Sequence, residues 1–317
     1  MRLIPISVII LACAAWGSSP AWVYEFQWGS FGTLAGQFRF PMGVYASNNT
    51  YIYVADTNNN RVQYFEDNGY PKGQWGESGT GDGQFNQPRD VKANNKGNIY
   101  VVDSLNDRIQ YFSGLGSFRG KWGTSGSGDG QFDGPFGIAV SPDGDIYVAD
   151  SGNNRIQYFT STGSFLGKWG SEGVGDGQFK TPRGIAVASD GTVYVADVSN
   201  YRVQYFSSSG SFLGRWGSKG TGAGQFDYPW ALTISPTGDV YVSDYNNLRI
   251  QYFTPTGSYL GAIGGAGQFN SQVGISYNPL GPQLYVADAG NARIQRYRCT
   301  NAAVVPASLG SIKALFE

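Results

Sequence analysis

Short stretches rich in valine, isoleucine, tyrosine, phenylalanine and tryptophan recur along the chain, separated by clusters of glycine, asparagine, aspartate, serine and proline. This alternation is typical of β-strands joined by tight turns, and no stretch has a convincing helical period. Between residues 130 and 170 the pattern predicts four strands, at 137–140, 145–150, 155–160 and 165–169. The sequence therefore predicts an all-β protein made of short antiparallel strands.

The same pattern is repeated six times. Each copy contains a strand similar to Tyr-Val-Ala-Asp, and its aspartate is followed five residues later by an arginine that begins the next strand. Successive aspartates are 47 residues apart, except for 44 between the last two. Four-stranded repeats of this length cannot bury both of their faces alone, so six copies predict a six-bladed β-propeller. The pairs are Asp56 and Arg61, Asp103 and Arg108, Asp150 and Arg155, Asp197 and Arg202, Asp244 and Arg249, and Asp288 and Arg293.

The two ends of the repeat array predict how the ring closes. The sixth repeat stops after three strands, near Arg298, whereas an isolated fourth-strand motif containing Trp28 precedes the first repeat. We expect this N-terminal strand to complete the last blade, because closure removes an exposed sheet edge. The expected domains are an N-terminal segment at 1–21, a propeller at 22–298 and a C-terminal tail at 299–317.

Residues 182–206 contain Pro-x-Gly-Ile-Ala-Val, Tyr-Val-Ala-Asp, Asn-x-Arg-Val-Gln and an aromatic pair, in that order. In these motifs the chain resembles the NHL-repeat family, and the resemblance extends over about residues 22–298. It implies a six-bladed propeller. Some related propellers are metal-dependent lyases or lactonases, and intracellular relatives of the tripartite-motif type bind nucleic acid through a basic face. Because one fold hosts many functions, the resemblance predicts the fold more strongly than the activity.

Composition narrows the functional classes. The chain contains no histidine, which removes the usual neutral-pH general base and every imidazole metal ligand. Twenty-two basic residues against 23 acidic ones leave no overall basic excess, which disfavours a nucleic-acid partner. The lyases of this group use histidine ligands, and the Glu, Asn and Asp set of the lactonases cannot be assembled from the variable positions. We therefore expect no enzymatic activity, no cofactor and no metal, with a metal-dependent lyase or lactonase-like enzyme as an alternative.

Two repeated charged features are interpreted as structural. The aspartate–arginine pairs occur in every blade at one spacing, as expected of an ion pair that locks each blade. Three loops that enter blades read Gly-x-Gly-Asp-Gly, with Asp82, Asp129 and Asp176. One aspartate per loop is far short of the oxygens that calcium needs, so these glycines are expected to turn the chain.

A binding surface is expected where the blades differ from one another. The residue after the proline of each first strand varies and should lie near the ring axis, on the same face as the turns that contain Tyr201 and Tyr245. Arginine and large aromatic side chains are typical of binding surfaces, here for a protein or glycan ligand. The alternative is that these side chains only plug the central channel. The positions are Met42, Arg89, Phe136, Arg183 and Trp230, with Val273 in the last blade.

The termini suggest export. Residues 1–21 have a positive start, an apolar run and small residues before Ala21, as in a secretory signal peptide, and the run is too short to span a membrane. The alternatives are a retained apolar segment and a lipid anchor at Cys13. Removal of the segment would leave Cys299 as an odd thiol. Asn48 begins the only N-glycosylation sequon.

Together these patterns predict a secreted or cell-surface, non-enzymatic propeller that acts as a binding or structural module. The apolar tail also suggests a homo-oligomer formed through the termini, and the corresponding alternative is a subunit that assembles head-to-tail into an extracellular fibre.

Overall fold

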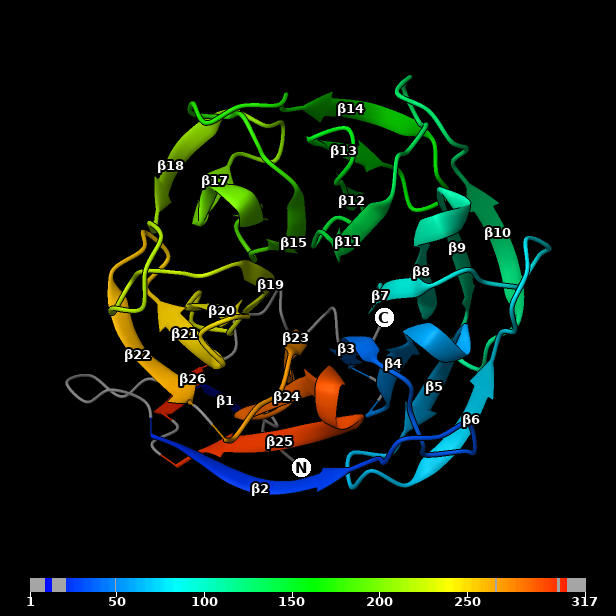
Figure 1. Cartoon of the computed structure of the whole chain (residues 1–317), viewed down its shortest axis with the longest axis horizontal. Helices are drawn as coiled ribbons and strands as arrows, with labels where there is room; N and C mark the ends of the chain where they lie inside the picture. Colours follow the sequence, from blue (N-terminus) through cyan, green and yellow to red (C-terminus); the bar gives the residue numbers. More distant parts are fainter. Residues whose placement is uncertain (1–8, 13–20, 49, 266, 301–302, 307–317) are drawn as a thin grey trace, which may run out of the picture.

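The computed structural model describes residues 9–12, 21–48, 50–265, 267–300 and 303–306. Six four-stranded antiparallel sheets surround a central axis, and their colours run in chain order around the ring (Figure 1). The predicted six-bladed, all-β propeller is thereby confirmed. Parts of the signal-peptide and tail predictions, Cys13 among them, fall outside the described residues.

Each blade begins with its innermost strand and ends at the rim (Figure 1). Blade 1 contains β3 (Pro41–Ala46), β4 (Ile52–Asp56), β5 (Arg61–Phe65) and β6 (Pro71–Trp75). Blade 2 contains β7 (Pro88–Ala93), β8 (Asn98–Asp103), β9 (Arg108–Ser113) and β10 (Phe118–Trp122). Blade 3 contains β11 (Pro135–Val140), β12 (Ile146–Asp150), β13 (Arg155–Phe159) and β14 (Phe165–Trp169), within two residues of the predicted bounds.

Blades 4 and 5 repeat this arrangement. Blade 4 contains β15 (Pro182–Val187), β16 (Val193–Asp197), β17 (Arg202–Phe206) and β18 (Phe212–Trp216). Blade 5 contains β19 (Pro229–Ile234), β20 (Val240–Asp244), β21 (Arg249–Phe253) and β22 (Tyr259–Gly264).

Short 3₁₀ turns follow the second strand in four of the blades: η1 (Thr57–Asn59), η2 (Ser104–Asn106), η3 (Val198–Asn200) and η4 (Ala289–Asn291).

The sixth blade takes strands from both ends of the repeat array. Its inner strands are β23 (Gln272–Tyr277), β24 (Gln283–Asp288) and β25 (Arg293–Cys299), and its outer strand is β2 (Trp22–Trp28). β2 pairs antiparallel with β25, with Trp22 opposite Cys299 and Trp28 opposite Ile294. This pairing confirms the predicted ring closure.

A separate two-stranded sheet pairs β1 (Ile9–Ala12) with β26 (Ala303–Pro306). Cys299 is 2% exposed and is not a free thiol in the full chain. The expectation of an odd cysteine applies to a chain without residues 1–21 and stays a prediction. Within the described ranges no helix is both long and apolar enough to cross a membrane.

The core is divided into apolar clusters that each lie between two neighbouring blades. Second strands such as β12 are buried at every position, because other blades cover both faces of the sheet there. The outer strand β14 instead alternates between half-buried and exposed positions. The sequence accordingly shows near-continuous apolar runs in the second strands and period-two patterns at the rim.

The repeated aspartate and arginine form one buried network in each blade. In blade 3, Arg155 Nε donates to Asp150 Oδ2 at 2.7 Å, and Gln157 Nε2 donates to the same oxygen at 3.1 Å. The Arg155 guanidinium also donates to the backbone oxygens of Gln131 and two neighbouring loop residues. The network therefore fixes the loop that enters the blade to the second and third strands. All six expected pairs are within 2.8 Å.

The Gly-x-Gly-Asp-Gly loops carry a second, exposed set of ion pairs. Each aspartate contacts a basic residue on the outer strand of the blade that it enters. The pairs are Asp82 with Lys121 at 2.6 Å, Asp129 with Lys168 at 2.5 Å and Asp176 with Arg215 at 3.1 Å. Because these side chains are about half exposed, such pairs contribute little to stability.

Tyrosine hydroxyls of the second strands connect neighbouring blades. Tyr147 donates to the carbonyl oxygen of Ser208 at 3.0 Å, and Tyr194 donates to that of Pro255 at 3.1 Å. Burial and then the charge of Asp145 raise the pKa of Tyr147 to about 12. Burial likewise raises the pKa of Tyr194 to about 12. A hydroxyl that donates must keep its proton, so these bonds require neutral tyrosine.

We expect the urea concentration at half-unfolding to fall as the pH rises from about 10 to about 12. Unfolded tyrosine ionises near its ordinary pKa of about 10, whereas these two ionise near 12 in the fold. The unfolded state therefore loses protons first, and the stability contribution that is complete below pH 10 is lost in this window. A Tyr147→Phe, Tyr194→Phe variant should show a shallower dependence. An equal pH dependence of unfolding in the wild type and this variant would contradict the expectation.

Candidate functional site

The six innermost strands line a central channel, and the second residue of each lies near one of its mouths. Four of these residues contact one another across blades 2 to 5. Arg183 Cζ lies 3.7 Å from the ring centre of Trp230 and 4.9 Å from that of Phe136. Arg89 Cζ lies 4.8 Å from the ring centre of Phe136. The predicted variable positions of these blades are therefore in direct contact.

Aromatic rings extend this contact. Phe136 and Trp230 pack edge-to-face with centres 5.5 Å apart, and Trp230 stacks on Tyr245 at 4.6 Å. Tyr245 comes from the turn after β20, and its hydroxyl contacts the Ser271 hydroxyl at 3.2 Å. The following residues are called the arginine–aromatic cluster: Arg89, Phe136, Arg183, Trp230 and Tyr245.

The remaining first-strand positions fill the channel beside the cluster. Met42 and Val273 belong to an apolar group that also contains Trp230 and Tyr245. The cavity left between these side chains is only about 20 Å³. The side chains thus close the channel at this level, as in the plug interpretation, while Trp230 and Tyr245 stay half-buried rather than fully covered.

Tyr201 lies apart from the cluster. Its ring packs edge-to-face on Tyr228 at 5.5 Å, and Lys219 Nζ lies 5.0 Å from its centre. The equivalent Asn154 uses its side chain differently, since its Oδ1 accepts from the backbone nitrogen of Thr181 in the next blade at 2.8 Å. The turn position therefore connects adjacent blades, and the ring contacts of Tyr201 are with Tyr228 and Lys219.

Tyr228 is a residue that the sequence comparison missed. It precedes Pro229, has a left-handed φ of 61° and accepts a hydrogen bond through its carbonyl from the Tyr245 nitrogen. It contacts Tyr201 by its ring, and its charge in the ionised state would act on Arg183. Comparing the residues that precede the first-strand prolines, and not only those that follow them, would have found it.

The cluster carries positive charge. Burial lowers the pKa of the Arg89 guanidinium, and burial together with the charge of Arg89 lowers that of Arg183 to about 10. A pKa of about 10 leaves the Arg183 guanidinium charged near neutral pH. Within the part of the chain that the structure describes, no three acidic or cysteine side chains lie close enough together to hold a metal ion.

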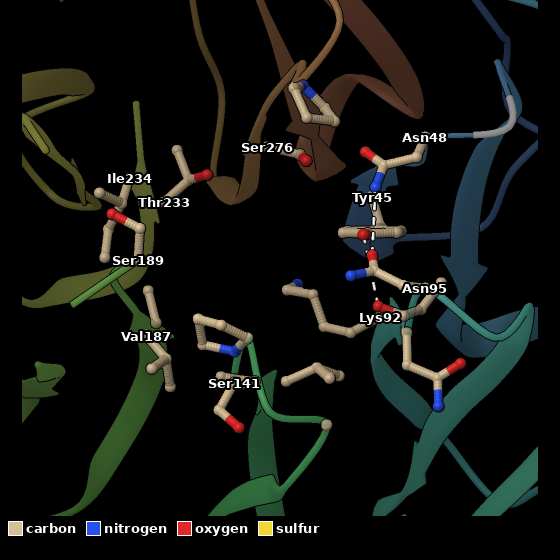
Figure 2. Close-up of a pocket in the computed structure, with 18 of the residues that line it drawn as sticks. Tyr45, Asn48, Lys92, Asn95, Ser141, Val187, Ser189, Thr233, Ile234 and Ser276 are labelled. Carbon is tan, nitrogen blue, oxygen red and sulfur yellow. Dashed lines mark hydrogen bonds between the residues drawn. The ribbon is translucent and has the colours of Figure 1, made fainter. Parts of the chain in front are cut away.

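The opposite mouth is wider. A hollow of about 480 Å³ lies where the innermost strands end, and it is lined by side chains from all six blades. Figure 2 shows Thr233 and Ser189 on one side of it, facing Tyr45 and Lys92 on the other. Lys92 Nζ pairs with Asp90 at 2.8 Å.

The predicted glycosylation residue lies at this wide mouth. Asn48 is exposed, and its amide donates to the side-chain oxygen of Asn95 at 3.2 Å (Figure 2). A glycan on Asn48 would therefore be attached next to the hollow.

Sequence comparison identifies the repeat. The model of the NHL repeat matches residues 132–159, 179–206 and 226–253. A 47-residue stretch is 45% identical to "B-box type zinc finger protein ncl-1" of Caenorhabditis elegans and to "Protein brain tumor" of Drosophila melanogaster. These stretches are 15% of this chain but only 6% and 4% of the two relatives, so the chain spans a small part of either.

Solved structures share the architecture. A gluconolactonase of Xanthomonas campestris is 14% identical with a TM-score of 0.66, covering 94% of this chain and all of that one. A Staphylococcus aureus virginiamycin B lyase is 14% identical with a TM-score of 0.60, covering 88% and 99%. A Bacteroides thetaiotaomicron protein of unknown function is 16% identical with a TM-score of 0.68, covering 88% and 76%. At these identities the likeness is one of fold alone.

Proposed function

We propose that this chain, which is an NHL-repeat six-bladed β-propeller, is a secreted, non-enzymatic module that binds a protein through the arginine–aromatic cluster. One observation carries the proposal. The blades share the same aspartate–arginine network. The first-strand positions that vary across blades 2, 3, 4 and 5 instead contact one another at one mouth of the channel. Residues that differ from blade to blade are not required by the repeated framework, so they are the best candidates for a function specific to this protein.

The side-chain types favour a protein ligand. Tryptophan, tyrosine and arginine dominate the binding energy of protein interfaces, because they combine a large apolar area with polar groups. Trp230 and Tyr245 form a stacked, half-buried pair with few freely rotating bonds, so little conformational entropy is lost on binding. The glycan alternative uses the same rings and is separated from the protein ligand by experiment.

Replacing Trp230 and Tyr245 together by alanine should weaken ligand binding at least tenfold, since interface hot spots contribute about 2 kcal/mol or more each. Binding to extracellular proteins of the source and to a glycan array would be measured with the wild type and the variant. Leu213→Ala is the matched control, because Leu213 is a 53% exposed apolar residue on the rim strand β18. Equal binding by all three proteins would contradict the proposed site, and variant-sensitive glycan binding would replace the protein ligand.

Export and lack of catalysis belong to the same proposal. The support for export is the charged and apolar pattern of residues 1–21, and the N-terminal residue of the native protein tests it. A start near Trp22 is expected, and an intact Met1 on an intracellular protein would contradict export. Because two solved neighbours are titled as a lyase and a gluconolactonase, a lactone and lyase substrate screen is the matching test of the non-enzymatic part. Turnover by the purified chain would overturn it.

A further inference from the structure

We propose that Arg89 and Arg183 form a subsite for a single carboxylate group, supplied by an acidic side chain of the bound protein. This inference rests on the proposed function, because the carboxylate belongs to the ligand of the arginine–aromatic cluster. It also specifies the ligand, which must place an acidic residue at the closed mouth of the channel.

The two guanidinium groups have unused donors. Arg89 Nε, Arg183 Nε and Arg183 Nη1 are buried and have no hydrogen-bond acceptor within the described part of the chain. The framework arginine Arg155, by contrast, donates to a carboxylate and to three backbone oxygens. Buried charged donors without acceptors are costly, and an anion is the partner that satisfies both their charge and their hydrogen bonds.

The acidic side chain closest in sequence cannot supply that anion. Asp90 also lines the narrow cavity, but its Oδ1 accepts from the Val91 nitrogen and from Lys92 Nζ. Its Oδ2 accepts from the Ile138 nitrogen of the next blade at 3.1 Å. Both carboxylate oxygens of Asp90 are therefore used by backbone nitrogens of the channel wall and by Lys92. Asp90 does not neutralise the charge of the two arginines.

Size and shape favour a carboxylate over a larger anion. The narrow cavity, which Arg89 lines, is about 20 Å³, the scale of one or two water molecules. Both guanidinium groups contact the same ring, Phe136, at 4.8 and 4.9 Å, so this ring is an apolar wall for each of them. A planar guanidinium fork matches the two oxygens of a carboxylate, and exclusion of water by the ring strengthens that contact.

The test follows the arginine Nε–H signals of the full-length chain, labelled with ¹⁵N-arginine, during titration with sodium acetate at constant ionic strength. Saturable shifts of the Arg89 and Arg183 signals are expected, together with a rise in melting temperature. Arg89→Met and Arg183→Met should each weaken acetate binding at least tenfold. Arg119→Met is the control, because Arg119 is exposed on the rim strand β10 and its side chain bonds to Asn98.

A second readout separates a binding role from a purely structural one. Methionine keeps the length of the arginine stem, so Arg183→Met without acetate should be as stable as the wild type or more stable. Loss of stability in that variant with no acetate-dependent shift in the wild type would overturn the subsite. Tighter binding of phosphate or sulfate than of acetate would overturn the carboxylate assignment.

The source of the carboxylate and the proposed function are tested apart. N-acetylglutamate amide should bind more tightly than glucuronate if the group comes from a protein side chain, and the reverse order overturns that source. A protein ligand that is sensitive to the Trp230 and Tyr245 substitutions but unaffected by Arg183→Met would leave the proposed function standing and overturn this inference. Acetate binding that depends on the two arginines, without any macromolecular ligand, would overturn the proposed function and the protein source of the carboxylate, and would leave only the carboxylate site.

Discussion

Deleting residues 22–28 will leave a chain that does not form a stable closed ring. β2 is the outer strand of blade 6, so its loss exposes the unpaired backbone groups of β25. It also removes Trp28, which packs 5.8 Å from Phe65 and 6.1 Å from Tyr285 between the last and first blades. Trp28 is half-buried, so its loss alone costs less than the roughly 3–5 kcal/mol of a fully buried tryptophan.

β2 also carries a carboxylate that neutralises arginine charges on β25. Glu25 pairs with both Arg296 and Arg298 at 2.7 Å, and deletion leaves these arginines without that carboxylate. The combined loss approaches the whole stability of a typical domain, about 5–15 kcal/mol. Circular dichroism and size-exclusion chromatography should therefore report an unfolded or aggregated chain.

The control for this deletion is restoration in trans. A synthetic peptide of residues 21–29 should recover cooperative unfolding of the deleted chain, because β2 pairs only along β25 and needs no covalent link to do so. A deleted chain that unfolds at the same urea concentration as the wild type, without peptide, would show that closure contributes nothing.

Asp103→Ala is the point substitution with the largest expected loss of stability. Asp103 is fully buried and accepts from Arg108 Nε at 2.6 Å, from Asn106 and Gln110 side chains and from the Asn86 nitrogen. Alanine leaves the 6% exposed Arg108 as a buried cation without its carboxylate. Breaking such a pair from one side costs about 3–5 kcal/mol.

Asp82→Ala in the same blade is the matched control. It also breaks a carboxylate pair, with Lys121 at 2.6 Å, but there both side chains are about half exposed, so the expected cost is below about 1 kcal/mol. Urea unfolding of the two variants and the wild type measures the difference. Similar losses in both would mean that burial does not set the strength of the repeated pair.

The fold was predictable because each element leaves its own mark in the sequence. The aspartate and the arginine five residues later fix the second and third strands of a blade. The two form the same ion pair in every copy, with the aspartate fully buried. The isolated Trp28 motif predicted closure because a sheet with three strands at one end of the chain must obtain its fourth from the other. Both signals are local in sequence, and the propeller topology determines where each one lies in space.

The site was predictable only in part. Arg89, Phe136, Arg183 and Trp230 occupy equivalent positions, so ring symmetry alone brings them to one mouth. Tyr201 could not be placed, because its turn contacts a residue of the next blade, and no local pattern pairs it with Tyr228. The wide mouth was missed because strand ends and small polar side chains line it, and neither has a signature in sequence.

Because the last blade takes strands from both ends of the repeat array, the ring cannot close until nearly the whole chain has been synthesised. Gln27 and Arg293 contact each other across 266 positions of chain, so the first propeller strand to be made must wait for nearly the last. At about 5–20 residues per second, that interval is roughly 13–53 s of translation. During this interval β2 has not yet paired with β25. Any chaperone or translocation machinery that acts on the nascent chain therefore binds a propeller whose ring is still open.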